Sequence, residues 1–214
     1  MNKIILFDVD GTLVDSKDAI YTSFSNVFRD NSLPPPPKHK VSSFIGYPLN
    51  EMFKIFGVDS NDIDRFCAEY KNYYLRISNQ LIKILPNAIA SLNLAKSFAI
   101  LGIVTTKSSR STRELLSNFG VLDLFSVIIG REDVSSPKPN PEPILKALDS
   151  IKDSKYKEAF MVGDTILDLQ AALKSNVNGI GVLCGYGSLA LLEKYSKWIF
   201  NDTLEAVEFI KNRN

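Results

Sequence analysis

Histidine and cysteine, the side chains that nucleophilic triads and soft metal sites most often use, are nearly absent from this chain. Its 214 residues include one histidine and two cysteines. His39 stands beside a run of prolines, which argues against a histidine-based triad or a histidine-rich metal centre. Cys67 and Cys184 lie far apart and match neither a disulfide framework nor the spacing of zinc ligands. We therefore expect other side chains to carry the chemistry.

The chain also lacks an excess of one charge and any long apolar run. Its 25 basic residues nearly balance 24 acidic ones, and the net charge of +1 gives no electrostatic reason to expect nucleic acid or an acidic membrane as a partner. Asp8 interrupts the first apolar stretch, so no secretory signal is expected. No later stretch reaches membrane-spanning length. These absences predict a cytoplasmic protein with no nucleic-acid or membrane partner. We expect a monomer or a homodimer.

Short apolar runs rich in Ile, Val, Leu and Phe recur along the chain, with helical patterns between them. The runs cover residues 4–7, 99–105, 126–130, 159–163, 179–183 and 198–200. They show no clean alternation, which is typical of strands buried on both faces of a parallel sheet. Repeated strand–helix units wind such a sheet into a three-layer sandwich. The expected fold class is therefore α/β, with a doubly wound, Rossmann-like parallel sheet.

Residues 17–83 depart from this alternation. They contain no convincing strand, and their apolar residues recur at helical spacing. Four prolines at 34–37 separate the first helix from the rest, because such a run stays extended. We expect residues 17–83 to form a small all-helical insert in a core built from residues 1–16 and 84–214.

The motif Asp8-Val9-Asp10-Gly11-Thr12 follows the first apolar run directly. Residues two apart in an extended chain project to the same side, so these two carboxylates can converge beyond the strand end. Two carboxylates that close repel each other unless a cation or a proton separates them. A polar turn that caps the next helix is the structural alternative. The buried strand before the motif and three further motifs downstream favour a chemical role.

The three further motifs follow other predicted strands. Thr105 ends the run 99–105 and Thr106 follows it, where a capped helix start is the alternative to an anion site. Lys138 is held between prolines at the mouth of a helix, and a rigid surface loop would look the same. Asp164 and Asp168 follow the run 159–163, where acidic residues also favour a helix start through its dipole.

All four motifs lie at or just beyond the carboxyl end of a predicted strand, the edge of an open α/β sheet where ligands bind. Three acidic residues converging there suggest a hard divalent cation, and oxygen ligands favour Mg²⁺. A lysine and a threonine beside such a cation suggest a phosphate group. No triad and no Walker-type loop is visible, but Asp8 can itself be a nucleophile, because carboxylates form aspartyl-phosphates.

The order Asp-x-Asp-Gly-Thr, strand-terminal Thr, Lys-Pro-x-Pro and Gly-Asp-x-x-x-Asp resembles the haloacid dehalogenase superfamily of phosphohydrolases over nearly the whole chain. The helical insert resembles the small cap of that superfamily. The stretches 45–49 and 85–88 resemble its phosphoglycolate phosphatase and β-phosphoglucomutase branch. The resemblance implies that Asp8 is the nucleophile and Asp10 the general acid and base. It also implies that Thr105, Thr106 and Lys138 bind the phosphate.

For the metal, the resemblance implies Mg²⁺ bound by Asp8, by the main-chain carbonyl of Asp10 and by Asp164, with Asp168 as a ligand or an orienting residue. Within this branch, Leu49 occupies a position where some members carry a working Lys or Arg, and this departure fits a plain phosphatase better than a phosphonate-cleaving enzyme or a mutase. Thr106 stands where Asn is common, so it retains a backbone N–H for an oxyanion but lacks the carboxamide.

The expected function is Mg²⁺-dependent hydrolysis of a small phosphorylated metabolite, such as a phosphoglycolate-like monoester. A pyrophosphatase or nucleotidase and a sugar-phosphate mutase are the alternative enzymes. A regulator that keeps the fold without catalysis is a third class, but it would be expected to lose the nucleophile, the acid, the lysine or the metal-binding aspartate, and none is missing. Substrate selection is expected on the cap, with Phe44, Gly46, Tyr47 and Arg76 as candidates.

Overall fold

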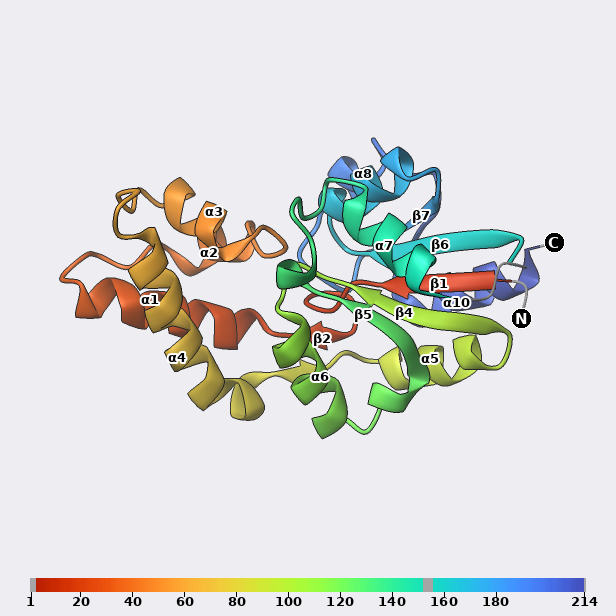
Figure 1. Cartoon of the computed structure of the whole chain (residues 1–214), viewed down its shortest axis with the longest axis horizontal. Coiled ribbons are helices and arrows are strands. Elements are labelled where there is room, and N and C mark those ends of the chain that lie inside the picture. Colours follow the sequence, from red (N-terminus) through yellow and green to blue (C-terminus); the bar gives the residue numbers. More distant parts are fainter. Residues whose placement is uncertain (1–2, 152–155, 214) are drawn as a thin grey trace.

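A computed structural model describes residues 3–151 and 156–213 of the chain (Figure 1). Within these residues, six strands form a parallel sheet in the order β5-β4-β1-β6-β7-β8. The strands of this sheet are β1 (Lys3–Phe7), β4 (Ala99–Val104), β5 (Phe125–Ile129), β6 (Glu158–Gly163), β7 (Asn178–Val182) and β8 (Ile199–Phe200). Each lies within about two residues of a predicted apolar run, so the predicted α/β fold with a doubly wound parallel sheet is confirmed.

Helices cover both faces of the sheet, which makes the expected three layers (Figure 1). The helices beside the sheet are α5 (Ala88–Lys96), α6 (Ser109–Asn118), α7 (Glu142–Ser150), α8 (Ile166–Lys174), α9 (Leu189–Leu192) and α10 (Thr203–Asn212), with the short 3₁₀ turns η1 (Leu122–Leu124) and η2 (Arg131–Asp133). Ile4 and Leu6 of β1 pack in one core with α7 and α8. Ile5 and Phe7 pack in the other core with α5 and α10. Burial on both faces explains why this strand lacks alternation.

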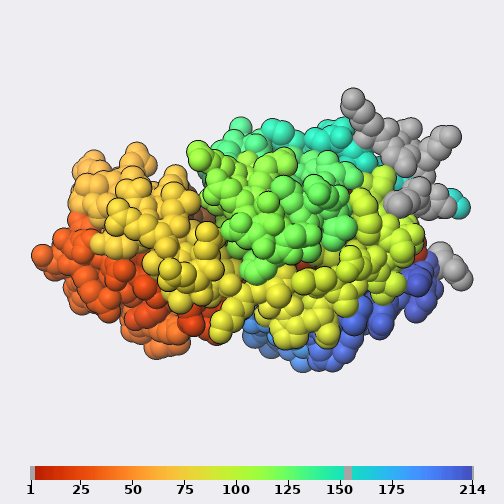
Figure 2. All heavy atoms as spheres, turned by 90° about the horizontal axis from the view of Figure 1, so that it is seen from below, coloured from red at the N-terminus to blue at the C-terminus, as the bar shows by residue number. Residues whose placement is uncertain are grey.

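The chain between Lys17 and Leu81 is built from helices and loops, while Lys83, the last residue expected in the helical insert, lies in a short strand. The helices are α1 (Lys17–Asp30), α2 (Lys38–Ser42), α3 (Leu49–Ile55) and α4 (Ile63–Leu81). Phe24, Phe53 and Phe66 are buried inside this group, and the rings of Phe24 and Phe53 stack with centroids 4.4 Å apart. Aromatic burial of this kind gives the helices a core of their own. The group forms a lobe beside the sheet, coloured red-orange to yellow in Figure 2.

Two short strands join the helical lobe to the sheet. β2 (Val14–Asp15) leaves the first motif and pairs antiparallel with β3 (Lys83–Ile84), which returns the chain to α5. The pairing brings the two connections side by side at one place. Sequence patterning did not predict these strands, because two-residue segments carry no periodic signal.

No helix among residues 3–151 and 156–213 combines the length and the apolar character that a membrane crossing requires.

Candidate active site

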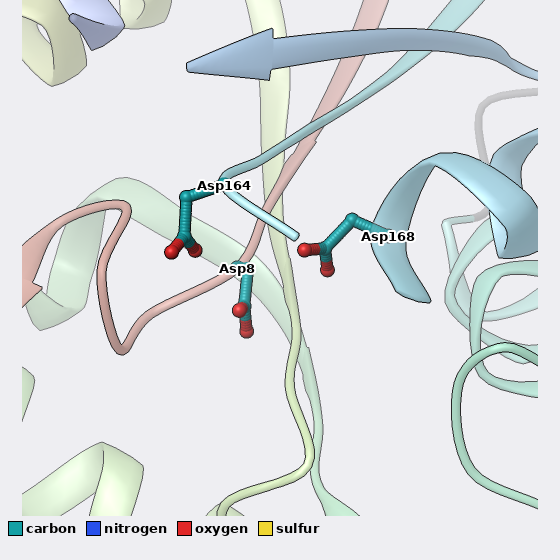
Figure 3. A group of neighbouring side chains, drawn as sticks. All are labelled: Asp8, Asp164 and Asp168. Carbon is teal, nitrogen blue, oxygen red and sulfur yellow. The ribbon is translucent and has the colours of Figure 1, made fainter. Parts of the chain in front are cut away.

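Three buried aspartates gather at the carboxyl edge of the central strands. Asp8 follows β1, Asp164 follows β6, and Asp168 lies in the first turn of α8. Each offers one carboxylate oxygen, and these oxygens all lie within 4.8 Å of one another. Figure 3 shows the three carboxylates facing a common space. Because β1 and β6 are parallel neighbours, the sheet itself brings their two carboxyl ends together.

Asp164 is held by its surroundings from several sides. Thr12 Oγ1 donates a hydrogen bond of 3.1 Å to its Oδ1, and the backbone N–H of Tyr186 donates one of 2.7 Å to its Oδ2. Two glycines pack against the carboxylate. A Cβ atom added at Gly11 or at Gly185 would lie 2.3 or 2.2 Å from Asp164 Oδ2, which no real contact allows. Glycine at both positions therefore leaves room for this side chain.

Lys138 is buried, with 3% of its surface exposed, and it contacts the carboxylates of both Asp8 and Asp168. Its Nζ lies 2.6 Å from Asp168 Oδ1 and 3.0 Å from Asp8 Oδ1, and it donates to the Val104 carbonyl at 2.8 Å. The second oxygen of Asp168 accepts from Thr165 N and Thr165 Oγ1 at 3.0 and 2.7 Å. Asp168 therefore completes a capping box with Thr165 at the start of α8, and its other oxygen contacts the lysine.

Burial and mutual repulsion raise the pKa values of two of these carboxyl groups. The pKa of Asp8 rises to about 6 through burial and the Asp168 charge, although the Lys138 ammonium opposes the rise. The pKa of Asp164 lies well above its ordinary value through burial and the charges of Asp168 and Asp8. Burial alone would lower the pKa of Lys138, but Asp168 and Asp8 raise it, so the lysine stays charged. One cation does not balance three carboxylates.

The donor set fits a bound Mg²⁺ ion. Asp8 Oδ1 is buried, and its close partner is the Lys138 ammonium at 3.0 Å, an ion pair without good hydrogen-bond geometry. The same ammonium also serves Asp168, so three buried carboxylates share one cation, and a bound metal ion would offset the remaining desolvation cost and repulsion. The available donors are carboxylate oxygens, which a hard cation prefers over the nitrogen and sulfur ligands of zinc sites.

The Asp10 carboxylate lies outside this trio and faces a different partner. Both of its oxygens lie 3.4 Å from Lys107 Nζ, and the two side chains are only 13% and 9% exposed. Sequence reasoning missed Lys107. A signal was present, because this residue directly follows Thr105 and Thr106 at the same strand end. The structure thus separates the first motif into a carboxylate among the buried trio and a carboxylate beside a second lysine.

The two threonines after β4 differ in their contacts. Thr105 is 4% exposed, and its Oγ1 accepts a hydrogen bond of 3.2 Å from the backbone N–H of Lys107. The hydroxyl of Thr106 donates a hydrogen bond of 2.9 Å to the carbonyl of Gly46 in the helical lobe. A Cβ at Gly46 would lie 3.0 Å from Thr165 Cγ2, so the lobe is docked closely on the site. Of the four lobe residues predicted to select the substrate, Gly46 thus lies against residues at the edge of the site.

Tyr186 is another residue that sequence reasoning missed. Its backbone holds Asp164, while its hydroxyl accepts a hydrogen bond of 2.9 Å from Ser16 N and donates one of 3.1 Å to Asp15 Oδ1. Asp15 and Ser16 form the exit from β2 to α1. The loop after β7 therefore links the carboxylate trio to the connection with the helical lobe. Its position after a strand at the same sheet edge was the available signal.

Comparison with known proteins gives one family. A family model described as haloacid dehalogenase-like hydrolase matches residues 5–182. The phosphoglycolate phosphatase of Neisseria meningitidis is 30% identical over 200 residues, covering 89% of this chain and 84% of that protein. Pyrophosphatase PpaX of Bacillus velezensis is 33% identical over 180 residues, covering 83% and 82%. The crystal structure of a haloacid dehalogenase-like hydrolase from Bacteroides fragilis aligns with a TM-score of 0.89 at 29% identity, covering 95% of this chain and 98% of that one.

These matches confirm the resemblance that the four motifs suggested. The family model runs from β1 to the end of β7, so it includes all four motifs and the helical lobe between the first two. The Bacteroides fragilis structure shares the complete architecture, sheet and lobe together, over nearly the full length of both chains. The chain belongs to the haloacid dehalogenase-like hydrolases.

Proposed function

We propose that this hydrolase is a Mg²⁺-dependent phosphatase that acts on a small phosphorylated metabolite through a phosphorylated Asp8. The observation that carries the proposal is the position of the Asp8 carboxylate. It is buried at the sheet edge, with Oδ1 3.0 Å from the Lys138 ammonium. An oriented carboxylate beside a fixed cation is suited to attack a phosphoryl group, because the cation offsets the repulsion between the two anions.

The reaction has two steps in this proposal. An oxygen of Asp8 attacks phosphorus, the bond from phosphorus to the leaving oxygen breaks, and that oxygen takes a proton from Asp10. Asp10, now ionised, then accepts a proton from the water molecule that hydrolyses the aspartyl-phosphate, which returns both residues to their starting states. General acid–base help of this kind contributes about 10² to 10⁴ in rate.

The remaining residues would bind and orient. Asp8, the Asp10 carbonyl and Asp164 would hold Mg²⁺, which neutralises negative charge on the transferring phosphoryl group when bound. Lys138 would contact the same phosphoryl oxygens, and Asp168 would keep its ammonium in place, consistent with the 2.6 Å contact. Thr105 would add a hydroxyl, and Thr106 a backbone N–H, since its own hydroxyl is engaged by Gly46.

The helical lobe, residues 17–83, would serve as a cap over a core made of residues 1–16 and 84–214. Phosphoryl transfer profits from the exclusion of water, and the product must then leave, so a cap that opens and closes suits the reaction. The paired connections β2 and β3 support this assignment, because both crossings between lobe and sheet occur at one place. In this proposal, the Thr106–Gly46 hydrogen bond forms when the cap is closed on the core and breaks when the cap opens.

The substrate class is supported by the relatives. Phosphoglycolate phosphatase and pyrophosphatase PpaX both act on small phosphorylated compounds, as their names state. We favour a phosphoglycolate-like monoester, with pyrophosphate as the alternative. Leu49 begins α3 in place of the Lys or Arg expected of a mutase. A comparison of kcat/KM for phosphoglycolate, pyrophosphate and β-glucose 1-phosphate separates these classes.

The purified protein should hydrolyse p-nitrophenyl phosphate in the presence of Mg²⁺. Removal of the metal with a chelator should lower kcat by about 10² or more, because buried carboxylates would then face an anionic substrate with only Lys138 between them. Added Mg²⁺ should restore the rate, while Ca²⁺, which is larger and takes more ligands, should not. Metal-independent turnover of every phosphate ester tested would contradict the proposed function.

Substitution of Gly185 by alanine should weaken Mg²⁺ binding. The new Cβ would lie 2.2 Å from Asp164 Oδ2 and 2.3 Å from the Gly11 carbonyl oxygen, so the carboxylate must move. Loss of such a supporting contact typically lowers metal affinity by about 10- to 100-fold. Titration of the protein with Mg²⁺ by calorimetry measures the change directly.

Gly57→Ala is the matched control for that variant. Gly57 lies in the helical lobe at φ +83°, and an added Cβ would meet nothing within 4 Å in the described part of the chain. Alanine in this left-handed conformation should lower the free energy of unfolding by about 1–2 kcal/mol. The affinity for Mg²⁺ should stay unchanged. If folded Gly185→Ala protein bound Mg²⁺ as tightly as the unaltered protein, the assignment of Asp164 as a ligand would be wrong.

A further inference from the structure

Lys107 has no part in the phosphate or metal chemistry described above, yet it lies between Asp10 and the helical lobe. Its ammonium is 3.4 Å from each Asp10 oxygen, an equal approach to both. On its other side it donates a hydrogen bond to the hydroxyl of Tyr74, and its Nζ lies 4.3 Å from the centroid of that ring. Tyr74 comes from α4, in the lobe, while Lys107 and Asp10 come from the sheet edge.

The surroundings hold this arrangement in place. The Lys107 side chain is 9% exposed, so its charge is largely removed from water and must be paired locally. Its backbone is also fixed, because its N–H donates to Thr105 Oγ1 and its carbonyl accepts from Arg131 N at 2.9 Å. Tyr74 is 7% exposed and stacks on Tyr70, with ring centroids 5.6 Å apart. Lys107, which contacts Asp10, and Tyr74, which contacts Lys107, are thus both positioned by packing.

We propose that Lys107 is a positioning residue for Asp10, and that Tyr74 makes this positioning depend on the docked lobe. The inference rests on the proposed role of Asp10 as general acid and base. When the lobe is docked, as the Thr106–Gly46 hydrogen bond shows here, Tyr74 contacts Lys107, and Lys107 keeps both Asp10 oxygens in one orientation. When the lobe leaves, the lysine loses the tyrosine hydroxyl and ring, and Asp10 loses a fixed partner.

The arrangement has a functional consequence. Proton transfer demands accurate placement of the acid, and a misplacement of 1 Å can lower a rate by about 10². An acid that is oriented only under a docked lobe would protonate a leaving group only after water has been excluded. Premature protonation and premature activation of water, before substrate is enclosed, would both be suppressed.

The test compares two esters of equal charge and similar shape, phenyl phosphate and p-nitrophenyl phosphate. The nitrophenolate leaves without much need for a proton, whereas phenolate needs one. Lys107→Met, which retains the length of the stem, should lower kcat/KM for phenyl phosphate by about 10- to 100-fold and change that for p-nitrophenyl phosphate much less. Tyr74→Phe, which removes the hydroxyl alone, should produce the same split with a smaller amplitude.

Two controls accompany these variants. Tyr70→Phe removes a hydroxyl from the stacked neighbour, which makes no hydrogen bond to Lys107, and should leave both esters unaffected. Lys107→Arg retains a cation and should recover most of the rate with phenyl phosphate. Thermal unfolding of each variant shows whether it is folded at the assay temperature.

Equal losses for the two esters would overturn the inference, because they would indicate a general structural role or a phosphate-binding role for Lys107. A loss that instead follows added negative charge on the leaving group, seen by including phosphoglycolate and pyrophosphate, would assign Lys107 to substrate binding and would also overturn it. Failure of the unaltered protein to hydrolyse any of these compounds would reject the proposed function, which is a different outcome from the loss of the split alone.

Discussion

Replacement of Asp8 by asparagine should abolish turnover of every phosphate ester that the unaltered protein hydrolyses. An amide is a very poor nucleophile and a weaker ligand for Mg²⁺ than a carboxylate. The described residues provide no second nucleophile at this position, because Asp164 and Asp168 are engaged by donors on both oxygens. We expect a loss beyond the detection limit of the assay, with no phosphorylated protein formed.

Asp10→Asn is the paired variant, because the proposal gives the two aspartates different duties. Its main-chain carbonyl is preserved, so Mg²⁺ should still bind, but acid–base help of about 10² to 10⁴ should be lost. With p-nitrophenyl phosphate the first step can still run, while hydrolysis of the aspartyl-phosphate slows. Full activity in folded Asp8→Asn protein would end the hypothesis, and identical behaviour of the two variants would leave their separate roles without support.

Removal of the Lys138 ammonium should lower kcat by a factor of about 10² to 10³, the loss typical of one electrostatic stabiliser. The structure adds a second effect. Lys138 contacts Asp8 and Asp168 in a buried site, so its loss leaves two carboxylates without their cation. Breaking a buried ion pair from one side typically costs about 3–5 kcal/mol. Lys138→Met retains most of the aliphatic stem and is therefore preferred over alanine.

Steady-state kinetics, with circular dichroism at the assay temperature, separate the two effects on Lys138. Lys38→Met is the matched control, because Lys38 forms an ion pair of 2.6 Å with Asp18 on the surface. An exposed pair of this kind contributes little to stability, because water screens its charges, and neither stability nor turnover should change much. Near-normal kcat in folded Lys138→Met protein would show that the lysine is structural and not a phosphate ligand.

The sheet and the carboxylate trio could be predicted from sequence for one reason. Strands buried on both faces leave continuous apolar runs, and the residue after each run falls on one sheet edge. Asp8 and Asp164 were predicted in this way, and Lys138 from the prolines that flank it in the loop after another run. The structure brings Asp8 close to both Asp164 and Lys138. Asp168 was predicted either to cap a helix or to be a metal ligand or orienting residue. One of its oxygens accepts a hydrogen bond from Thr165 at the start of α8, and the other accepts one from Lys138.

The contacts between lobe and sheet could not be predicted in the same way. Lys107 meets Tyr74 only because α4 docks over the end of β4, and no periodicity in either segment encodes that approach. The Tyr186 hydroxyl likewise reaches Ser16 across a distance of 170 residues in sequence. β2 and β3 are too short to produce a pattern. Docking of one lobe on another depends on tertiary packing, which local sequence does not report.

The central claim is that the phosphoryl group passes through Asp8, and mass spectrometry of acid-quenched protein tests it most directly. Asp10→Asn protein mixed with Mg²⁺ and p-nitrophenyl phosphate should gain one phosphoryl group on the peptide that contains Asp8. The same peptide should stay unmodified in Asp8→Asn protein and in samples without Mg²⁺. A phosphoryl group on a different peptide, or release of nitrophenol by Asp10→Asn protein without any adduct, would contradict the proposed mechanism.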